Sequence, residues 1–299
     1  MAGIDFKRDI DFEYGDCDQI SPLIRRVIAK NPGPFTFTGS GTYIIGTGKV
    51  AVIDPGPRRE EHLHALLKAV EGEEVTHILV THTHNDHSPL AKELKAATGA
   101  KTYAFGPYPV SGDVDGSPME EGHDTEFDPD VRLKDGEIIS GDGWIMEAVH
   151  TPGHTSNHMC FALKEERALF SGDHVMGWST SVIVPPDGDM KSYFDSLDKL
   201  LTRDDEIYWP THGPAIIDPK PFVQSFITHR RAREDQILAC LKDGYTLIKD
   251  MVPVMYAGVD KRLYGPAALS VSAHMIHMAA TGRVKLLSGT PLDGEYELA

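Results

Sequence analysis

The sequence predicts an α+β protein in which helices back a β-sheet. Three observations support this fold class. Short apolar runs rich in β-branched residues recur along the chain, stretches with apolar residues at helical spacing lie between them, and ligand-type side chains follow several of the runs. Because the first hundred residues read as three strands followed by alternating helices and strands, a sheet covered by helices accounts for their order.

The strands expected in the N-terminal half are short and separated by turn residues. They are Phe35–Thr38, Thr42–Ile45, Val50–Ile53, Val75–Val80 and Lys101–Ala104, with an edge segment within Ile20–Ile28. The glycines of Gly46-Thr-Gly48 predict a hairpin turn after Ile45. Helices are expected at Glu60–Val70 and Pro89–Thr98, and Gly99 closes the second helix.

After residue 130 the chain returns to short strands, several of which end in small residues and a potential ligand. The expected elements are strands at Val131–Leu133, Glu137–Ile139, Gly143–Val149, Met159–Leu163, Ala168–Phe170 and Glu206–Trp209, and a helix at Tyr193–Leu201. Before them, the acidic and glycine-rich stretch Pro107–Pro129 lacks apolar periodicity and predicts a long loop. We expect His123, within this loop, to be a surface histidine.

The last third of the chain predicts a separate C-terminal unit. Pro214–Pro221 is rich in proline and predicts a linker. Three helices and a short hairpin are expected after it, built from Phe222–Leu241, Thr246–Tyr256, Pro266–Ala280 and a strand at Arg283–Leu287. We therefore expect one domain at residues 1–215 and a second at residues 216–299.

The C-terminal unit contains a cluster of arginines and a pair of histidines. Arg230, Arg231 and Arg233 form a locally basic stretch, on which any binding of RNA should depend. His274 and His277 lie three residues apart on one helical face among methionine and isoleucine neighbours. Since an apolar stripe on a helix usually faces a core, we expect these histidines to be packed rather than to line an active site.

The composition restricts the classes of function. With 299 residues, of which 40% are hydrophobic and 25% are charged, the chain can bury a large core and is ordinary for a globular protein. The net charge of −16 disfavours nonspecific binding to nucleic acids or anionic membranes. Three widely spaced cysteines suggest no disulfide framework, and neither a signal peptide nor a membrane-spanning run is evident. A cytoplasmic protein without a membrane partner is therefore expected.

One segment concentrates the residue types that bind metals. His82-Thr-His84-Asn-Asp86-His87 follows the strand expected at Val75–Val80. In an extended backbone the His82 and His84 rings project to the same side, while Asp86 and His87 come where the chain turns toward a helix. One segment therefore offers two imidazoles in one direction and a carboxylate with an imidazole in another. This supply suits two adjacent divalent ions such as zinc, manganese or iron.

The segment resembles the signature of the metallo-β-lactamase superfamily. Further ligands of that superfamily have counterparts in matching contexts: His154 in a Thr-Pro-Gly-His-Thr-Ser run, Asp173 in Phe-Ser-Gly-Asp-His, and His212 in Pro-Thr-His-Gly-Pro. The resemblance implies an αββα sandwich of two mixed sheets flanked by helices. The C-terminal unit in turn resembles the winged-helix-like extension of one subgroup, the lactamase-β-like 2 type.

The resemblance also implies the ligand set and the cofactor. The ligands fall into two groups with a shared carboxylate: His82, His84 and His154 for one ion, Asp86, His87 and His212 for the other, and Asp173 bridging them. Two Zn²⁺ ions are the expected cofactor, with Mn²⁺ or Fe²⁺ as alternatives. Asp86 and Asp173 are the expected catalytic residues, Asp86 because it could also orient the attacking water.

Other residues are candidates for orienting these ligands. The candidates from the strand-end motifs are His150, Ser156, Asn157 and His174. Asp54, at the end of an expected strand, is predicted to orient a ligand rather than to bind metal. Tyr193 is a candidate donor to an oxyanion, as tyrosines are in some relatives.

A dinuclear site of this kind predicts a hydrolase that uses a metal-bridging hydroxide. We expect its substrate to be a small ester, thioester or lactone. The alternative is a phosphodiesterase or endoribonuclease acting on single-stranded RNA, as in relatives with the same tail, and promiscuous β-lactam hydrolysis is a further alternative. The acidic net charge and the short spacing between Asp173 and His212 favour the small substrate. The oligomeric state is left open.

Overall fold

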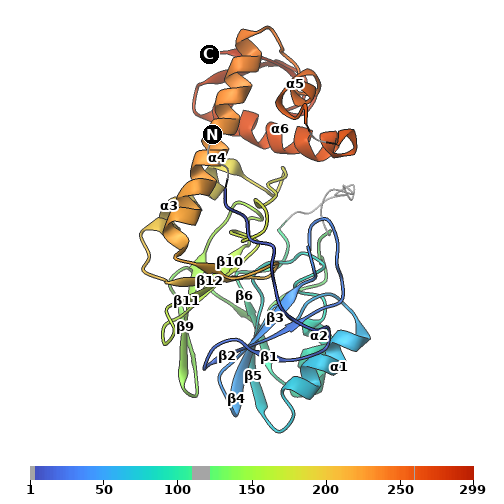
Figure 1. The fold of residues 1–299 in the computed structure, drawn as a ribbon, viewed down its shortest axis with the longest axis vertical. Helices are drawn as coiled ribbons and strands as arrows, with labels where there is room; N and C mark the ends of the chain where they lie inside the picture. Colours follow the sequence, from blue (N-terminus) through green and yellow to red (C-terminus); the bar gives the residue numbers. More distant parts are fainter. Residues whose placement is uncertain (1–3, 110–121, 259) are drawn as a thin grey trace.

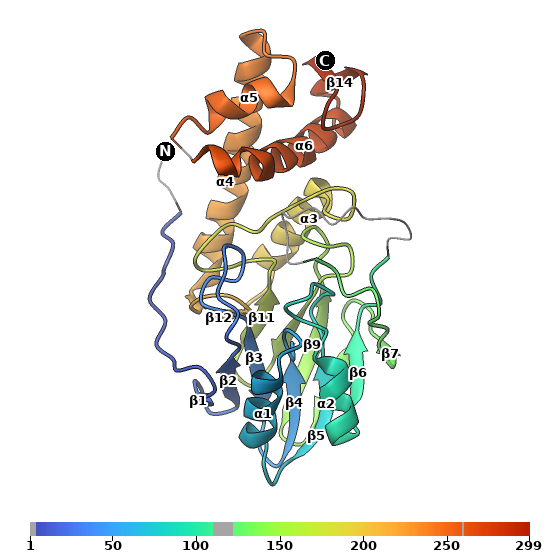
Figure 2. The same cartoon turned by 90° about the vertical axis from the view of Figure 1, so that its right-hand side faces the viewer.

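Two β-sheets face each other in the computed structural model, which describes residues 4–109, 122–258 and 260–299 (Figures 1 and 2). Helices cover the outer faces of both sheets, and a smaller unit of helices and a hairpin lies at one end of the molecule (Figure 1). The predicted α+β sandwich of two mixed sheets flanked by helices is therefore confirmed.

The first sheet is antiparallel at its N-terminal edge and parallel from its fourth strand onward. Its described strands, in spatial order, are β1 (Asp18–Gln19), β2 (Ile24–Ile28), β3 (Gly41–Ile45), β4 (Lys49–Ile53), β5 (Glu74–Leu79), β6 (Lys101–Ala104) and β7 (Val131–Arg132). The parallel strands need crossovers, which are supplied by α1 (Glu60–Ala69) and α2 (Ala91–Thr98).

The second sheet is antiparallel except where β11 pairs with β12. Its described strands, in spatial order, are β13 (Ile216–Ile217), β12 (Ile207–Pro210), β11 (Ala168–Gly172), β10 (Met159–Leu163), β9 (Trp144–His150) and β8 (Ile138–Gly141). The crossover between β11 and β12 contains α3 (Met190–Leu201), whose N-cap Asp189 accepts a hydrogen bond from the backbone N–H of Ser192.

Successive side chains along each strand point alternately into the space between the two sheets and toward the helices outside them. Tyr43 and Ile45 of β3 point into the space between the sheets, where Phe161 of the second sheet also packs, whereas Ile44 points toward the helices on the outer face. Complete burial of a side chain such as Phe161 contributes about 1.5–3 kcal/mol. Strand alternation therefore fixes the distance and register of the two sheets that carry the candidate ligands.

The helix α4 (Pro219–Lys242) joins the sandwich to the C-terminal unit (Figures 1 and 2). Val223 and Phe226, near its start, pack with α3 against the second sheet, and Ile237, near its end, belongs to the core of the C-terminal unit. That unit contains α5 (Ile248–Met255), the short helix η1 (Lys261–Leu263), α6 (Tyr264–Ala280) and the hairpin of β14 (Val284–Ser288) and β15 (Glu295–Leu298). None of the described helices is both long and apolar enough to cross a membrane.

Two expected elements are wrong. Phe35–Thr38 is a turn rather than a strand, because Phe37 adopts a left-handed backbone with φ of 55° and stacks on Trp178 with 4.9 Å between ring centroids. Pro214–Pro221 is not a linker: it contains β13 and the first turn of α4, since proline at a helix start loses no helical hydrogen bond. Residues 110–121 of the expected long loop lie outside the described residues.

Candidate metal centre

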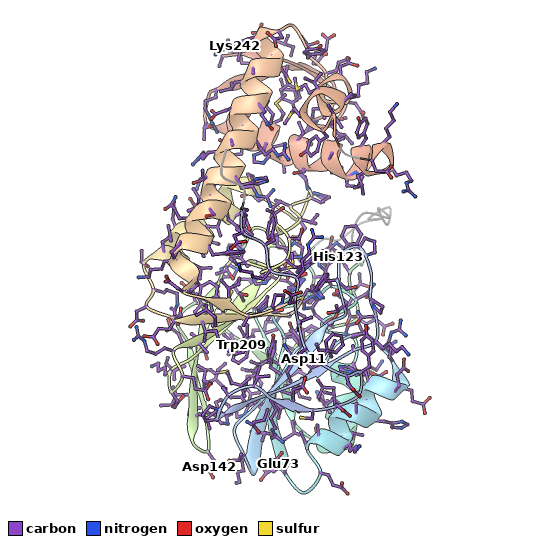
Figure 3. All side chains as sticks on the ribbon, viewed as in Figure 1. Asp11, Glu73, His123, Asp142, Trp209 and Lys242 are labelled. Carbon is purple, nitrogen blue, oxygen red and sulfur yellow. The ribbon has the colours of Figure 1, made fainter. Side chains whose placement is uncertain are left out.

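The candidate ligands meet at one edge of the sandwich, where strands of both sheets end. The turn Thr81–His87 follows β5, His154 follows β9, Asp173 follows β11 and His212 follows β12. All seven candidate side chains are buried. The edge lies on the side of the C-terminal helices, near His123 and opposite the edge that carries Glu73 and Asp142 (Figure 3). Because rigid strand ends carry them, the ligand positions do not depend on mobile loops.

Three imidazoles converge in the first group. The His84 Nδ1 atom lies 2.9 Å from the His82 Nε2 atom and 3.1 Å from the His154 Nε2 atom. Nitrogens bound at 2.0–2.1 Å to a tetrahedral ion are separated by roughly 3.3 Å. The three nitrogens are therefore spaced as ligands of one ion would be, and they form a cluster able to hold one.

The second group combines a carboxylate with two imidazoles. The Asp86 Oδ2 atom lies 2.9 Å from the His212 Nε2 atom and 3.4 Å from the His87 Nε2 atom. These three residues form a second cluster able to hold an ion. The Ser40 hydroxyl donates to the same Asp86 oxygen across 3.3 Å, which helps to fix the carboxylate.

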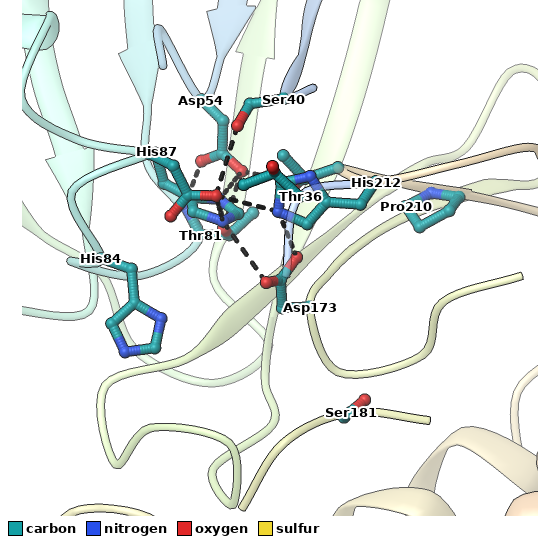
Figure 4. A network of polar contacts seen from close by, with 12 residues as sticks. Thr36, Ser40, Asp54, Thr81, His84, His87, Asp173, Ser181, Pro210 and His212 are labelled. Atoms are coloured by element: carbon teal, nitrogen blue, oxygen red, sulfur yellow. Dashed lines mark hydrogen bonds and ion pairs between the residues drawn. The ribbon is translucent and has the colours of Figure 1, made fainter. Parts of the chain in front are cut away.

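Asp173 lies between the two groups. Its Oδ2 atom is 3.9 Å from the His154 Nε2 atom and 3.6 Å from the His87 Nε2 atom, and its Oδ1 atom is 3.4 Å from the His212 Nε2 atom. Figure 4 shows the Asp173 carboxylate facing His212 across the site. A carboxylate so placed reaches both ligand groups.

The charges of the cluster suit cations. Burial opposes ionisation of Asp86, but His87 and His212 outweigh burial and hold the pKa of the carboxyl below its ordinary value. Burial and the neighbouring imidazoles lower the pKa of His82 well below its ordinary value, so this ring is neutral and can offer a lone pair. Burial opposes protonation of His87 and His212, but Asp86 and Asp173 outweigh burial, raise the pKa of His212 to about 10 and hold that of His87 above its ordinary value. The two buried carboxylates therefore attract positive charge, which these rings carry as protons when no metal is bound. The donor set is therefore suited to a pair of divalent ions.

Asp54 supports the centre from behind. Its Oδ2 atom accepts hydrogen bonds from His87 Nδ1 at 2.8 Å, Thr81 Oγ1 at 2.8 Å and Thr211 Oγ1 at 2.9 Å. Its Oδ1 atom accepts from the Thr81 backbone N–H at 2.8 Å. With Nδ1 of His87 held this way, the Nε2 atom of the ring points into the site (Figure 4). The backbone of Asp54 is left-handed, with φ of 49°, at the bend that turns its carboxylate inward.

Other ligand rings are fixed through their second nitrogen. His154 Nδ1 donates to the Val182 carbonyl at 2.6 Å, and His212 Nδ1 donates to the Gly39 carbonyl at 3.2 Å. Because the carbonyls hold these rings by Nδ1, their Nε2 atoms face the site.

His158 is a contributor that sequence reasoning missed. It is fully buried, and its Nε2 atom accepts the Asp173 backbone N–H at 3.2 Å, while its Nδ1 atom lies 2.9 Å from Thr151 Oγ1. A Cβ atom on Gly172 would lie 2.5 Å from His158 Nε2, so the glycine is needed for this approach. The signal available in the sequence was its position four residues after His154.

Several expected supporting residues lie elsewhere. The Tyr193 hydroxyl donates to the His174 carbonyl at 2.8 Å and does not face the ligands, so it is not an oxyanion donor. His150 stacks on Phe105 with 3.9 Å between ring centroids and bonds to a backbone carbonyl. His123 is not a surface histidine: it is partly buried, and its ring centroid lies 4.7 Å from that of His84.

The remaining three expected supports, Asn157, Ser156 and His174, contact the turns and backbone around the site. His174 is fully buried, and its backbone carbonyl accepts hydrogen bonds from the Ser181 and Tyr193 hydroxyls. Asn157 Nδ2 donates to Thr83 Oγ1 at 3.0 Å, within the turn that carries His82 and His84. The Ser156 backbone N–H donates to the Asp187 carboxylate.

A pocket opens onto the ligands. One side of it is polar and consists of candidate ligands from both groups, namely His84, Asp86, His154, Asp173 and His212. The lining also includes four apolar side chains, which we call the apolar wall: Phe35, Met176, Trp178 and Val182. None of the described residues that line this pocket is a lysine, an arginine or a tyrosine.

The three arginines of the basic stretch in α4 make contacts within the protein. Arg230 is buried and donates to the Ser181 carbonyl. Arg231 pairs with Glu234 at 3.0 Å, and the Arg233 guanidinium lies 4.4 Å from the centroid of the Tyr256 ring. These arginines therefore do not form a free basic face. His277 is buried as expected, although it bonds to Glu234 at 2.7 Å rather than packing only on apolar groups.

Known proteins resemble the chain in both sequence and fold. A family model described as "Metallo-beta-lactamase superfamily" matches residues 36–212, and one described as "Beta-lactamase associated winged helix domain" matches residues 248–290. An "Atrochrysone carboxyl ACP thioesterase" of Claviceps purpurea is 32% identical over 254 residues, which cover 82% of this chain and 75% of the relative.

Two solved structures extend the comparison. A beta-lactamase domain protein from Burkholderia ambifaria matches 97% of this chain and 96% of its own, with a TM-score of 0.80 at 19% identity, which shows the fold alone. TTHA1623, solved in a di-iron-bound form, is 28% identical with a TM-score of 0.52, and the match covers 65% of this chain and 95% of that one.

Proposed function

The chain belongs to the metallo-β-lactamase superfamily, and from this premise we propose that it is a metal-dependent hydrolase that cleaves a thioester with a small apolar acyl group. The observation that carries the proposal is the pocket, which is lined both by members of the two ligand groups and by the apolar wall. The activity named for the relative from Claviceps purpurea supports the same bond type.

The proposed metal ligands are the residues that the sequence suggested. One ion would be held by His82, His84 and His154, the second by Asp86, His87 and His212, and Asp173 would serve both. When bound, such a pair activates water as a nucleophile near neutral pH and polarises a carbonyl oxygen. Two Zn²⁺ ions are our first choice, and the di-iron form of TTHA1623 keeps iron as an alternative.

The protein residues divide the remaining tasks. Asp86, held by Ser40, would accept a hydrogen bond from the attacking water and so orient it toward the acyl carbon. Asp54 and the Val182 carbonyl keep the rings of His87 and His154 in place. The wall that contains Trp178 would receive the acyl group and exclude bulk water from it.

The lining of the pocket favours a thioester over other substrates. A thiol has a pKa of about 8.5, so a thiolate can depart without a proton donor, whereas alkoxide and amine leaving groups need one. No lysine or tyrosine lies among the described lining residues to supply that proton. The same described lining has no lysine or arginine to hold a phosphodiester, and Arg230 is buried away from solvent, so the RNA alternative gains no support.

We also propose a division of labour along the chain. Residues 1–215 would form the catalytic domain, because every candidate ligand precedes residue 215, and residues 216–299 would form an auxiliary winged-helix-like domain. Its own core begins at Ile237, whereas β13 and the first turns of α4 pack with the second sheet.

The proposal is tested with a panel of substrates in which the thioester and the oxygen ester share one benzoyl group. The zinc-loaded protein is given the benzoyl thioester of N-acetylcysteamine, the corresponding oxygen ester, a lactone, a β-lactam and a short single-stranded RNA. We expect kcat/KM to be highest for the thioester and to vanish when the metal is removed by a chelator. A higher kcat/KM for RNA or the β-lactam, or thioester cleavage that survives chelation, would contradict the proposal.

A further inference from the structure

A buried arginine of the C-terminal helix lies next to the loop that lines the pocket. Arg230 of α4 is only 4% exposed, and no carboxylate lies within ion-pair distance of it among the described residues. Burying a cation without a counter-charge is unfavourable, so a well-packed apolar residue would serve better if packing were the only requirement. The position therefore calls for another explanation.

Arg230 contacts the loop that contains Ser181 and the ring of Tyr193 in α3. Its guanidinium donates to the Ser181 carbonyl and lies 5.3 Å from the centroid of the Tyr193 ring. We call residues 176–182 the pocket loop, because Met176, Trp178 and Val182 within it line the pocket. Arg230 thus holds this loop through the Ser181 carbonyl.

Adjacent residues of the loop contact Arg230 and the candidate ligand His154. The carbonyl next along the chain, that of Val182, accepts the Nδ1 proton of His154 at 2.6 Å. A shift or rotation of the Ser181 peptide would move the Val182 carbonyl, and with it the ring whose Nε2 atom belongs to the first ligand group. Figure 4 shows Ser181 on a separate segment, with Asp173 between it and His212.

A second path leads from the same cluster to Asp173. The hydroxyl groups of Ser181 and Tyr193 both donate to the His174 carbonyl, at 2.7 Å and 2.8 Å. His174 directly follows Asp173, the carboxylate that reaches both ligand groups. Arg230, Tyr193 and Ser181 therefore support the backbone at two ligands at once.

From these contacts we propose that Arg230 is a positioning residue of the metal centre. By holding the Ser181 carbonyl against α4, it fixes the Val182 carbonyl that orients His154, so the C-terminal domain helps to set the geometry of the catalytic site. The inference rests on the proposed function, because it requires that His154 binds a metal ion. It also gives the arginine a role that does not involve nucleic acid.

The test uses Co²⁺ as a spectroscopic probe of the ligand geometry. Full-length Arg230→Met is compared with wild type and with Arg233→Met. This control removes a charge and a ring contact from the same helix, but its contacts are with Tyr256 and Gln236 rather than with the pocket loop. Each metal-free protein is titrated with Co²⁺ in the presence of a competing chelator, and visible absorption is recorded. Because the change acts on a partner of a ligand, we expect Arg230→Met to bind Co²⁺ about tenfold or more weakly and with an altered spectrum. Arg233→Met should match wild type.

Each outcome decides the proposal. If Arg230→Met is less stable to heat but binds Co²⁺ with wild-type affinity and spectrum, the arginine only packs the interface and the proposal is wrong. If Arg230→Met does not fold, Arg230→Lys replaces it: lysine keeps the charge but not the planar fork, and binding as tight as wild type would overturn the proposal. A wild-type protein that binds no Co²⁺ would overturn the proposed function and this inference together, whereas normal wild-type binding with no effect of Arg230 overturns the inference alone.

Discussion

Substitution of Asp54 tests how far the centre depends on a residue that binds no metal. The carboxylate accepts three hydrogen bonds at Oδ2, including one from His87, and one at Oδ1 from the Thr81 backbone. In Asp54→Asn the amide can place its oxygen toward the three donors, but its NH₂ group then faces the Thr81 N–H. One buried donor loses its acceptor, which costs roughly 1–3 kcal/mol of unfolding free energy. Asp54→Ala leaves all four donors without an acceptor and should lower the free energy of unfolding more than Asp54→Asn does.

Two measurements on the Asp54 variants check these values. Urea unfolding of the metal-free proteins gives the stability change, and competition with a chelator gives the zinc affinity. The affinity should fall about 10–100-fold in Asp54→Ala, where His87 loses its orienting partner, and less in Asp54→Asn, whose amide oxygen still accepts from His87. Asp135→Asn is the matched control, since Asp135 also accepts a backbone N–H but its side chain is 54% exposed. If both Asp54 variants stayed within about 0.5 kcal/mol of this control and bound zinc normally, the support assigned to Asp54 would be refuted.

Three further predictions follow from the site and the C-terminal core. Asp86→Ala should lower kcat/KM by about 10³-fold or more, and His123→Ala by less than about tenfold, because only Asp86 belongs to a ligand group. Gly172→Ala should destabilise the protein in urea unfolding, since its Cβ atom would lie 2.5 Å from His158 Nε2 and its φ is 52°. Burial lowers the pKa of His274 to about 4, so its neutral form stabilises the fold fully above an ordinary histidine pKa of 6.5, and this contribution is lost as the pH falls toward 4.

Control variants distinguish these predicted effects from nonspecific destabilisation of the protein. Equal activity of the Asp86 and His123 variants at saturating zinc would refute the ligand assignment. Gly136→Ala is the control for Gly172→Ala, because its φ is also positive but no atom lies within 4 Å of an added Cβ atom. For His274, urea unfolding at pH 7 and pH 4 should show that His274→Asn loses less stability on acidification than wild type, by up to roughly 3 kcal/mol. The charged groups that face this ring are Glu234, Arg230 and His277; equal losses would show that the ring does not couple folding to protonation.

Much of the fold and of the candidate metal centre could be predicted because the sequence patterns that specify them lie within short segments. The run from His82 to His87 lies within one turn after β5, and the ligands His154, Asp173 and His212 each follow an apolar strand that the alternation of the sequence reveals. What failed depends on contacts between distant segments. The turn at Phe37 is held by stacking on Trp178, which is 141 residues away along the chain, and no local pattern reports such a partner.

The misreading of the basic stretch has a different cause. The buried positions of α4 recur at helical spacing through Val223, Phe226, Arg230, Glu234 and Ile237, so Arg230 and Glu234 occupy the inward stripe of the helix. Reading the arginines as a contiguous charged run hid this periodicity. Periodicity analysis would have separated Arg230 from Arg231, whose side chain is 50% exposed.

Metal stoichiometry tests the central claim most directly. The metal-free protein is reconstituted with excess Zn²⁺, freed of unbound metal by gel filtration and measured by elemental analysis against protein concentration. The two ligand groups joined by Asp173 predict two ions per chain. His84→Ala and His212→Ala, each of which removes one ligand from a different group, should each retain close to one ion. One ion or none bound to the wild-type chain would contradict the dinuclear account.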